Sequence, residues 1–162
     1  MTSKDKLYGA IARDDTEAAQ EVVTRDPSVL VVRFLDTSWL HLAAQMGRIG
    51  IMEVLVRAGL AVDELTGDGV GTPLMSAAGQ GHYAACEWLL DHGADINHRL
   101  GVSATPIYSA IFSKSFDLVN LFVERGADLR ATFGDPPRNV ISYAQVFGTV
   151  QIVAYLTGRV DT

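Results

Sequence analysis

The chain repeats one short apolar phrase that ends in glycine, at a nearly constant interval. It reads VLVRAG at residues 54–59, WLLDHG at 88–93 and LFVERG at 121–126. The final glycines, Gly59, Gly93 and Gly126, lie 34 and then 33 residues apart. A period between about 20 and 50 residues is typical of chains that stack copies of one supersecondary unit. We therefore expect a repetitive array whose function lies on its surface.

Each unit opens with the signals of a helix start. The openings are SWLHLAA at 38–44, TPLMSAA at 72–78 and TPIYSAI at 105–111. A Ser or Thr side chain can accept a hydrogen bond from the first helical turn, and Pro is preset for the first helical position. Apolar residues at helical spacing follow, as at 51–56 and 118–123, and indicate a second helix. The predicted unit is a helix, a turn, a second helix that the recurring glycine ends in left-handed conformation, and an extended loop.

These motifs resemble the ankyrin repeat. The resemblance is carried by LHLAA at 40–44 in the first helix, and by GADIN at 93–97 and GADL at 126–129 after the second. It implies an all-α ankyrin-repeat solenoid of about five stacked helix-turn-helix units with projecting loop hairpins. Weaker copies of the pattern at both ends agree with this, because terminal repeats must present an outer face to water.

The resemblance covers nearly the whole chain and implies a single ankyrin-repeat domain over 1–162. The predicted boundaries are an N-terminal capping repeat at 4–34, repeats at 35–67, 68–100 and 101–133, and a C-terminal capping repeat at 134–162. One departure stands out within them. Lys114 and Ser115 occupy the place of a Gly-His pair, which argues against a tight turn between the helices of the repeat 101–133.

The composition excludes several functional classes. The net charge is -6 and no run of Lys or Arg occurs, so counterion release from nucleic acid could supply little affinity. No stretch approaches the roughly 18 apolar residues that a membrane span needs, and no apolar segment follows the first residues. A single cysteine, Cys86, cannot form an internal disulfide or a cysteine-based zinc site. We expect a cytoplasmic protein without a cofactor or bound metal.

The residues that could take part in catalysis or metal binding each have a structural role at their position in the repeat. The resemblance implies that His41 forms hydrogen bonds across the repeat loops, and His82 follows a glycine that ends a helix. Cys86 aligns with the buried stripe of the second helix and is expected to be a core thiol. Asp95 and Asp128 recur at one point of successive repeats and are expected to fix the turn through Asx-type bonds. We predict no catalytic residue; the remote alternative is an enzyme whose loop-side polar cleft uses His41, Asp36 and Asp68.

The resemblance also implies where a partner binds. First helices of this family line a concave surface, beside which the hairpins project, and large apolar residues at the variable positions there suggest an interaction patch. Trp39 and Phe34 have the alternative of packing into the hairpin layer, and Tyr108 fits either role. The predicted partner-binding residues are Phe34, Leu35, Thr37, Trp39, Gln45, Met46, Gln80, Tyr108, Phe112, Ser113, Asp135, Arg138, Val146 and Phe147.

The predicted function is a non-catalytic protein-protein interaction module that binds one partner across its concave face. Acidic loop residues would steer a partner with a basic surface; they are Asp36, Asp63, Glu64, Asp68 and Asp135. The single domain favours a stoichiometric inhibitor, such as a bacterial toxin-neutralising immunity protein, that is monomeric when unbound. The alternative is a scaffold or adaptor subunit of a larger complex.

Overall fold

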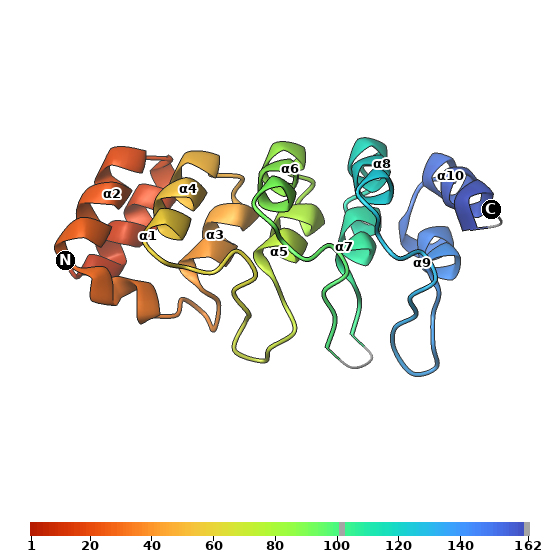
Figure 1. The fold of residues 1–162 in the computed structure, drawn as a ribbon, viewed down its shortest axis with the longest axis horizontal. Coiled ribbons are helices and arrows are strands. Elements are labelled where there is room, and N and C mark those ends of the chain that lie inside the picture. The colour runs from red at the N-terminus through yellow and green to blue at the C-terminus, as the bar shows by residue number, and fades with distance from the viewer. Residues whose placement is uncertain (101–102, 161–162) are drawn as a thin grey trace.

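The computed structural model describes residues 1–100 and 103–160, and this part of the chain is helical. The elements are α1 (Ser3–Arg13), α2 (Thr16–Arg25), the 3-10 helix η1 (Pro27–Val31), α3 (Trp39–Gln45), α4 (Ile49–Arg57), α5 (Pro73–Gly79), α6 (Tyr83–Asp91), α7 (Pro106–Phe112), α8 (Phe116–Glu124), α9 (Val140–Phe147) and α10 (Val150–Val160). They form five antiparallel pairs in a single row, and the loops between the pairs project together at one edge (Figure 1). The array is the predicted all-α solenoid.

Helix starts follow the sequence signals only in part. Thr72 accepts a hydrogen bond from the backbone of Met75 and precedes Pro73, as predicted, and Asn139 caps α9 in the same way. Ser38 makes no such bond, because its hydroxyl is engaged by His41 instead. Thr105 makes no side-chain bond to the first turn of α7 either. The capping prediction was therefore right for α5 and wrong for α3 and α7.

The turn between the two helices contains a left-handed residue in the first four pairs, whereas Gly148 between α9 and α10 is extended. Gly47 and Gly81 take left-handed backbone angles there, with φ of 68° and 76°. Lys114 takes the same conformation with φ of 62°, and Asp14 with φ of 59°. The doubt that Lys114 placed on a tight turn was wrong, because the lysine adopts the glycine conformation and bears its steric cost.

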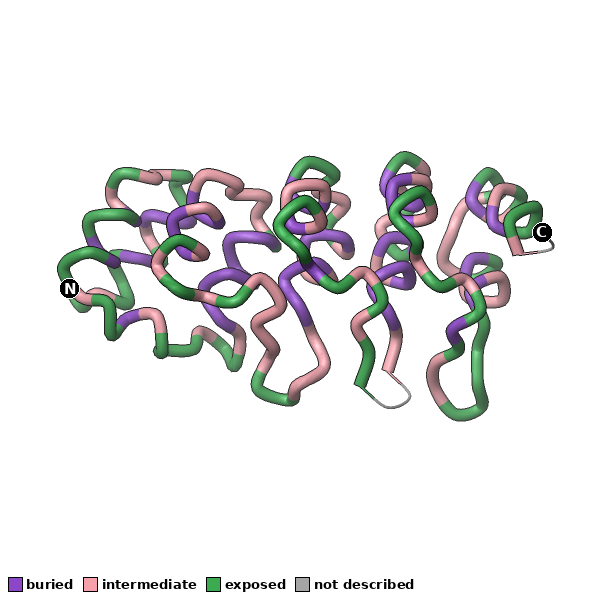
Figure 2. Tube along the Cα trace, viewed as in Figure 1, coloured by how far each residue is buried: buried purple, intermediate pink, exposed green. Residues whose placement is uncertain are grey.

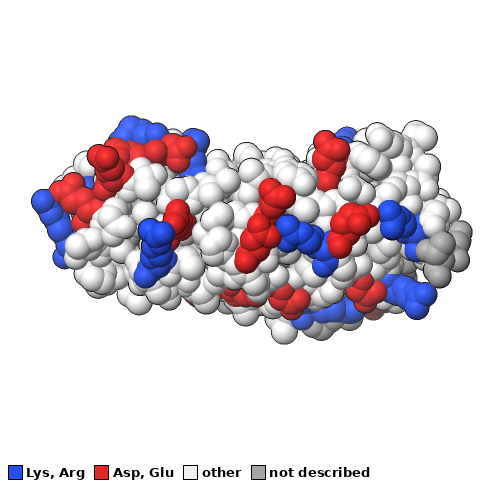
Figure 3. All heavy atoms as spheres, turned by 45° about the horizontal axis from the view of Figure 1, so that its top comes forward, with Lys and Arg blue, Asp and Glu red and all other residues white. Residues whose placement is uncertain are grey.

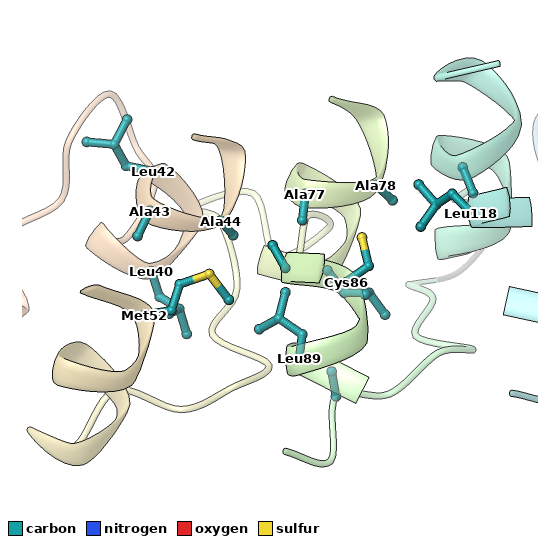
Figure 4. Close-up of a cluster of buried hydrophobic side chains, with 14 of the residues drawn as sticks. Leu40, Leu42, Ala43, Ala44, Met52, Ala77, Ala78, Cys86, Leu89 and Leu118 are labelled. Carbon is teal, nitrogen blue, oxygen red and sulfur yellow. The ribbon is translucent and has the colours of Figure 1, made fainter. Parts of the chain in front are cut away.

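The core is one continuous apolar layer between and within the helix pairs. Buried residues lie where each pair faces its neighbours, whereas the loop tips are exposed or half-buried (Figure 2). Leu40, Met52, Cys86 and Leu89 belong to one cluster that joins the second and third pairs (Figure 4). The prediction that Cys86 is a core thiol is confirmed, and burial raises its pKa to about 12.

Polar side chains connect each loop to the next one. The Ser38 hydroxyl lies 2.9 Å from His41 Nδ1, and His41 Nε2 donates to the carbonyl of Gly71 at 3.2 Å. Asp63 accepts from the backbone N–H of Asp95, one repeat further along the array. These bonds satisfy backbone groups that the extended loops would otherwise leave without partners, and they confirm the structural role predicted for His41.

The same hydrogen bonds from one loop to the next, which we call the loop ladder, continue through the next repeat. Asn97 stands one repeat after Asp63, and its side chain accepts from the N–H of Asp128 at 2.7 Å. Asp95 and Asp128 each accept from the N–H two residues further on, at 2.9 and 2.8 Å. The Asx-type turns predicted for these two carboxylates are confirmed.

The left-handed backbone conformation of Lys114 leads to a prediction about stability. Replacing Lys114 by Gly removes the steric cost of a side chain at positive φ, and the larger entropy of the unfolded glycine chain offsets only part of this gain. We expect Lys114→Gly to raise the free energy of unfolding by about 0.5 to 1 kcal/mol, measured by urea denaturation. Lys6→Gly within α1 is the matched control and should lower it by about 1 kcal/mol. A loss of stability in both variants would contradict this account.

The buried histidine yields a pH prediction. Burial is the main cause that lowers the pKa of His41 below its ordinary value of 6.5, and the bond to Gly71 only partly opposes it. The unfolded chain then binds the proton first, so stability is lost as the pH falls from about 6.5 through the lowered pKa. The lowered carboxyl pKa values of Asp5, Asp26 and Asp68 lie below 3.8, outside this range.

The measurement is the urea midpoint of the wild type and of His41→Gln between pH about 7.5 and about 5. The wild-type midpoint should fall across this range, and the variant, which cannot take up that proton, should show a shallower fall. Equal slopes for the two proteins would show that another group causes the dependence.

Candidate protein-binding surface

The first helices of the later pairs carry no charged side chain. None of α3, α5, α7 and α9 contains Asp, Glu, Lys or Arg. The second helices carry them instead, and acidic and basic residues alternate along that side of the array (Figure 3). The ion pairs Arg125–Asp91 and Arg159–Glu124, at 2.8 and 3.1 Å, belong to this row. We call the side formed by α3, α5, α7, α9 and the adjoining loops the inner face.

An aromatic cluster occupies the C-terminal half of the inner face. The rings of Phe112 and Phe147 lie 6.1 Å apart between centroids, and Tyr143 lies 4.6 Å from Phe147. Phe112 is 55% exposed, and Val146 beside Phe147 is 67% exposed. Tyr143 is half-buried, its ring packs edge-on against the buried Tyr108 at 5.1 Å, and burial raises the pKa of its hydroxyl. The cluster presents apolar surface above a packed aromatic base.

The structure divides the predicted partner-binding residues by exposure. The exposed ones are Leu35, Gln45, Gln80, Phe112, Asp135, Arg138 and Val146. The half-buried ones are Phe34, Thr37, Met46, Ser113 and Phe147, and the buried ones are Trp39 and Tyr108.

Two of the predicted contacts are wrong, because their side chains belong to the core. Trp39 is fully buried, and its Nε1 donates to the carbonyl of Val29 at 2.7 Å. Tyr108 is 2% exposed, and its hydroxyl donates to the carbonyl of Ala131 at 2.6 Å. Burial raises the pKa of Tyr108 to about 12. Each ring satisfies a loop carbonyl while filling the core, which is the usual arrangement for a buried Trp or Tyr.

Phe34 lies at the other end of the inner face from the aromatic cluster. Its ring stacks on Tyr8 at 4.9 Å and lies 6.1 Å from Trp39, with the Lys4 ammonium 5.7 Å from its centroid. It therefore packs mainly into the first hairpin layer, which was the alternative predicted for it. The single patch expected from the sequence is thus two separate groups, of which that around Phe112 is the more open.

The sequence prediction missed Tyr143 and Tyr8. Tyr143 stands at the register position of Ser76 and Ser109 in α5 and α7, so a large ring replaces a small hydroxyl there. The change from serine to tyrosine at one position of the repeat is the sequence signal that could have identified Tyr143. Tyr8 had none, because the first repeat matches the pattern weakly.

Two of the three polar residues of the alternative enzyme hypothesis form hydrogen bonds within and between the loops. His41 bonds to Ser38 and Gly71, and Asp68 accepts from the N–H of Val70 at 3.0 Å and from the Thr66 hydroxyl. Within residues 1–100 and 103–160, no three His, Cys, Asp or Glu side chains gather as a possible metal site. No helix in the described ranges has the length and apolar character that crossing a membrane requires.

Comparisons with known proteins agree with the observed architecture. A family model described as Ankyrin repeats (3 copies) matches residues 7–100 and again residues 40–133. A putative ankyrin repeat protein of Rickettsia felis is 31% identical over 118 residues, which cover 68% of this chain and 50% of that protein. Ankyrin repeat and SOCS box protein 5 of Mus musculus is 36% identical over 101 residues, which cover 62% of this chain and 30% of that protein.

A third relative is the inactive serine/threonine-protein kinase TEX14 of Mus musculus, 32% identical over 105 residues that make up 63% of this chain and 7% of the kinase. The chain thus spans half or less of the length of each of these relatives. The family model matches well over half of the chain, and the helix pairs and loop ladder have the form that it describes. The chain therefore belongs to the ankyrin repeat family, whose repeats form protein-protein interaction modules.

Proposed function

We propose that this protein binds one partner protein across its inner face, with the aromatic cluster of α7 and α9 as the main anchor. The observation that carries the proposal is the exposure of Phe112 and Val146 on a row of helices without charged residues. Packing within the array does not require large apolar side chains at these exposed positions. A contiguous exposed apolar patch on a soluble domain usually marks an interaction site.

The anchor is suited to a partner segment with an apolar side chain. The ring of Phe112 contacts that of Phe147, which packs on Tyr143, so an apolar side chain of the partner would lie against several aromatic rings. Aromatic residues at the centre of an interface commonly contribute about 2 kcal/mol or more when truncated. Met46, Gln45 and other residues of the inner face would extend the contact toward the N-terminal repeats.

The loops carry the charged side chains that would attract the partner. Asp36, Asp68 and Asp135 are exposed, whereas Glu64 pairs with Arg33 and Asp63 holds the backbone of the next repeat. The three exposed carboxylates would attract basic residues of the partner while its apolar residues meet the uncharged helices. The affinity should then depend moderately on salt, because only a few exposed charges take part.

We further propose stoichiometric inhibition as the mode of action, of which a toxin-neutralising immunity protein is one form. A surface that covers the partner along several repeats can block access to it without any chemistry. Titration of the partner's own activity with this protein should then end at one-to-one stoichiometry. An unchanged partner activity at saturation would instead support an adaptor or scaffold.

The proposal predicts the effect of removing two inner-face side chains. Met46→Ala together with Phe112→Ala should weaken the complex by more than tenfold, because the exposed anchor and a second apolar residue of the inner face are lost. The melting temperature should fall only slightly, since Phe112 is largely exposed and Met46 is half-buried. Affinity is measured by calorimetry with a partner first captured on the wild-type protein and identified by mass spectrometry.

Tyr83→Ala is the matched control. Tyr83 is a 40% exposed aromatic residue at the start of α6, on the second helices and away from the inner face. Its loss should leave the affinity unchanged. If the double variant binds as tightly as the wild type, or if Tyr83→Ala weakens binding equally, the inner-face proposal is wrong.

A further inference from the structure

The charges of the loop edge are unevenly distributed along the array. The hairpins at 33–38 and 61–71 carry four carboxylates, Asp36, Asp63, Glu64 and Asp68, and one arginine, Arg33. In the hairpins at 94–104 and 127–139, three carboxylates stand beside three arginines, namely Asp95, Asp128 and Asp135 with Arg99, Arg130 and Arg138. The loop edge is therefore acidic beside α3 and α5. Beside α7 and α9, where the aromatic cluster lies, its charges balance.

Two of the carboxylates lie together at the joined tips of the first two hairpins. The carbonyl of Asp36 accepts from the N–H of Gly67 at 2.9 Å, and its carboxylate occupies the space that a Cβ on Gly67 would need. Asp68 is the next residue, and hydrogen bonds from the Thr66 hydroxyl and the backbone lower its pKa. Asp36 and Asp68 are both exposed, whereas Arg33 is engaged with another carboxylate of the second hairpin.

Phe112, the exposed ring of the aromatic cluster, lies at the other edge of the inner face. It is the last residue of α7, whereas the hairpins lead into the first residues of the inner helices (Figure 1). An inner helix of seven residues is about 10 Å long, and neighbouring helices lie about 9 Å apart. Asp68 stands four residues before Thr72, the cap of α5, which adds at most about 14 Å of extended chain. The ring and the carboxylates are therefore about 20 to 25 Å apart, along a diagonal across α5.

The surface of α5 along this diagonal is low and uncharged. Gly79 stands at the register position of Phe112, and a Cβ there would meet no atom within 4 Å. Ser76 is likewise small, and the exposed amides of Gln80 and Gln45 stand beside this path. An amide side chain both donates to and accepts from a main chain, whereas the main-chain groups within a helix are already paired. The surface therefore suits an extended segment better than a helix.

We propose that the partner binds through an extended segment that has an apolar side chain at one end and basic side chains at the other. The apolar side chain lies on the ring of Phe112, and the basic ones lie at Asp36 and Asp68. A charge in the middle of the segment would lose hydration over helices that offer it no counter-charge. At about 3.3 Å per residue, the two ends are about six to eight residues apart. The inference rests on the inner-face binding proposed above and adds the chemistry of the partner.

The first test measures this spacing with synthetic peptides. Each peptide carries one phenylalanine and a pair of lysines, joined in either order by an uncharged linker of alanine and glutamine. We expect the tightest binding at linkers of about six to eight residues, by at least about tenfold over a scrambled peptide of the same composition. A helical segment would instead require about 13 to 17 residues. Binding is measured by fluorescence anisotropy of the labelled peptide.

The second test assigns each end of the peptide to its residues. Asp36→Asn with Asp68→Asn should weaken the peptide of best spacing about fivefold and remove its advantage over a peptide with glutamine for lysine. Glu17→Gln with Asp117→Asn is the matched control. It removes the same charge from exposed sites on α2 and α8, away from the inner face, and should keep that advantage.

Phe112→Ala should remove the advantage of a phenylalanine peptide over one with alanine in its place. Its melting temperature should stay close to that of the wild type, because the ring is 55% exposed. A variant that still distinguishes the two peptides would overturn the placement of the apolar end.

Three further results would overturn the proposal. They are tightest binding near 15 residues, which would indicate a helix, no peptide that binds more tightly than its scrambled form, and equal losses in the two carboxylate variants. Each leaves the inner-face proposal standing, because Met46→Ala with Phe112→Ala is measured on the intact partner. A partner that meets the inner face with a folded surface would satisfy that test and fail this one.

Discussion

Burial of one helix pair against the next is the interaction on which the rest of the structure depends. No pair encloses its own apolar side chains; Leu40, Met52, Cys86 and Leu89 lie in one cluster because two neighbouring pairs contribute to it. The loops follow from the same stacking, since the Asp63 and Asn97 side chains reach the backbone of the repeat that comes next. Stability in such an array is a sum over neighbours. Each repeat therefore depends on its neighbours to bury its apolar side chains.

The stacking also separates the surfaces by chemistry. Second helices face water along their length and carry ion pairs such as Arg125–Asp91, each of which adds little stability when exposed. The inner helices pack closely on one another and hold small or apolar residues, so α3, α5, α7 and α9 present a surface without charge. Exposed aromatic side chains on that surface have no role in the array itself. This is why Phe112, and not a more conspicuous residue such as Trp39, is the centre of the proposed interface.

The comparison of Trp39 with Phe112 shows how much of the binding surface could be predicted from the sequence. Both are large and apolar and were expected on the concave side, so both were predicted as partner-binding residues, with packing into the hairpin layer as the alternative for Trp39. Trp39 turned out to fill a space between the first hairpin and η1, where the carbonyl of Val29 accepts its indole N–H. Phe112 contacts the ring of Phe147 but stays 55% exposed. Lys114 is the corresponding case in the backbone, because its neighbours impose a glycine conformation on a residue that rarely adopts it.

The sequence by itself determined the helix pairs, their register, the left-handed glycines and the burial of Cys86, because all of these follow from local periodicity that repeats along the chain. It also determined the structural roles of Asp95 and Asp128, which recur at one point of successive repeats, and the family resemblance implied that of His41. Tertiary structure alone decided which aromatic side chains reach water, and that Phe34 and Phe112 lie in separate groups. These properties depend on the space left between neighbouring helices and loops, which the period does not encode.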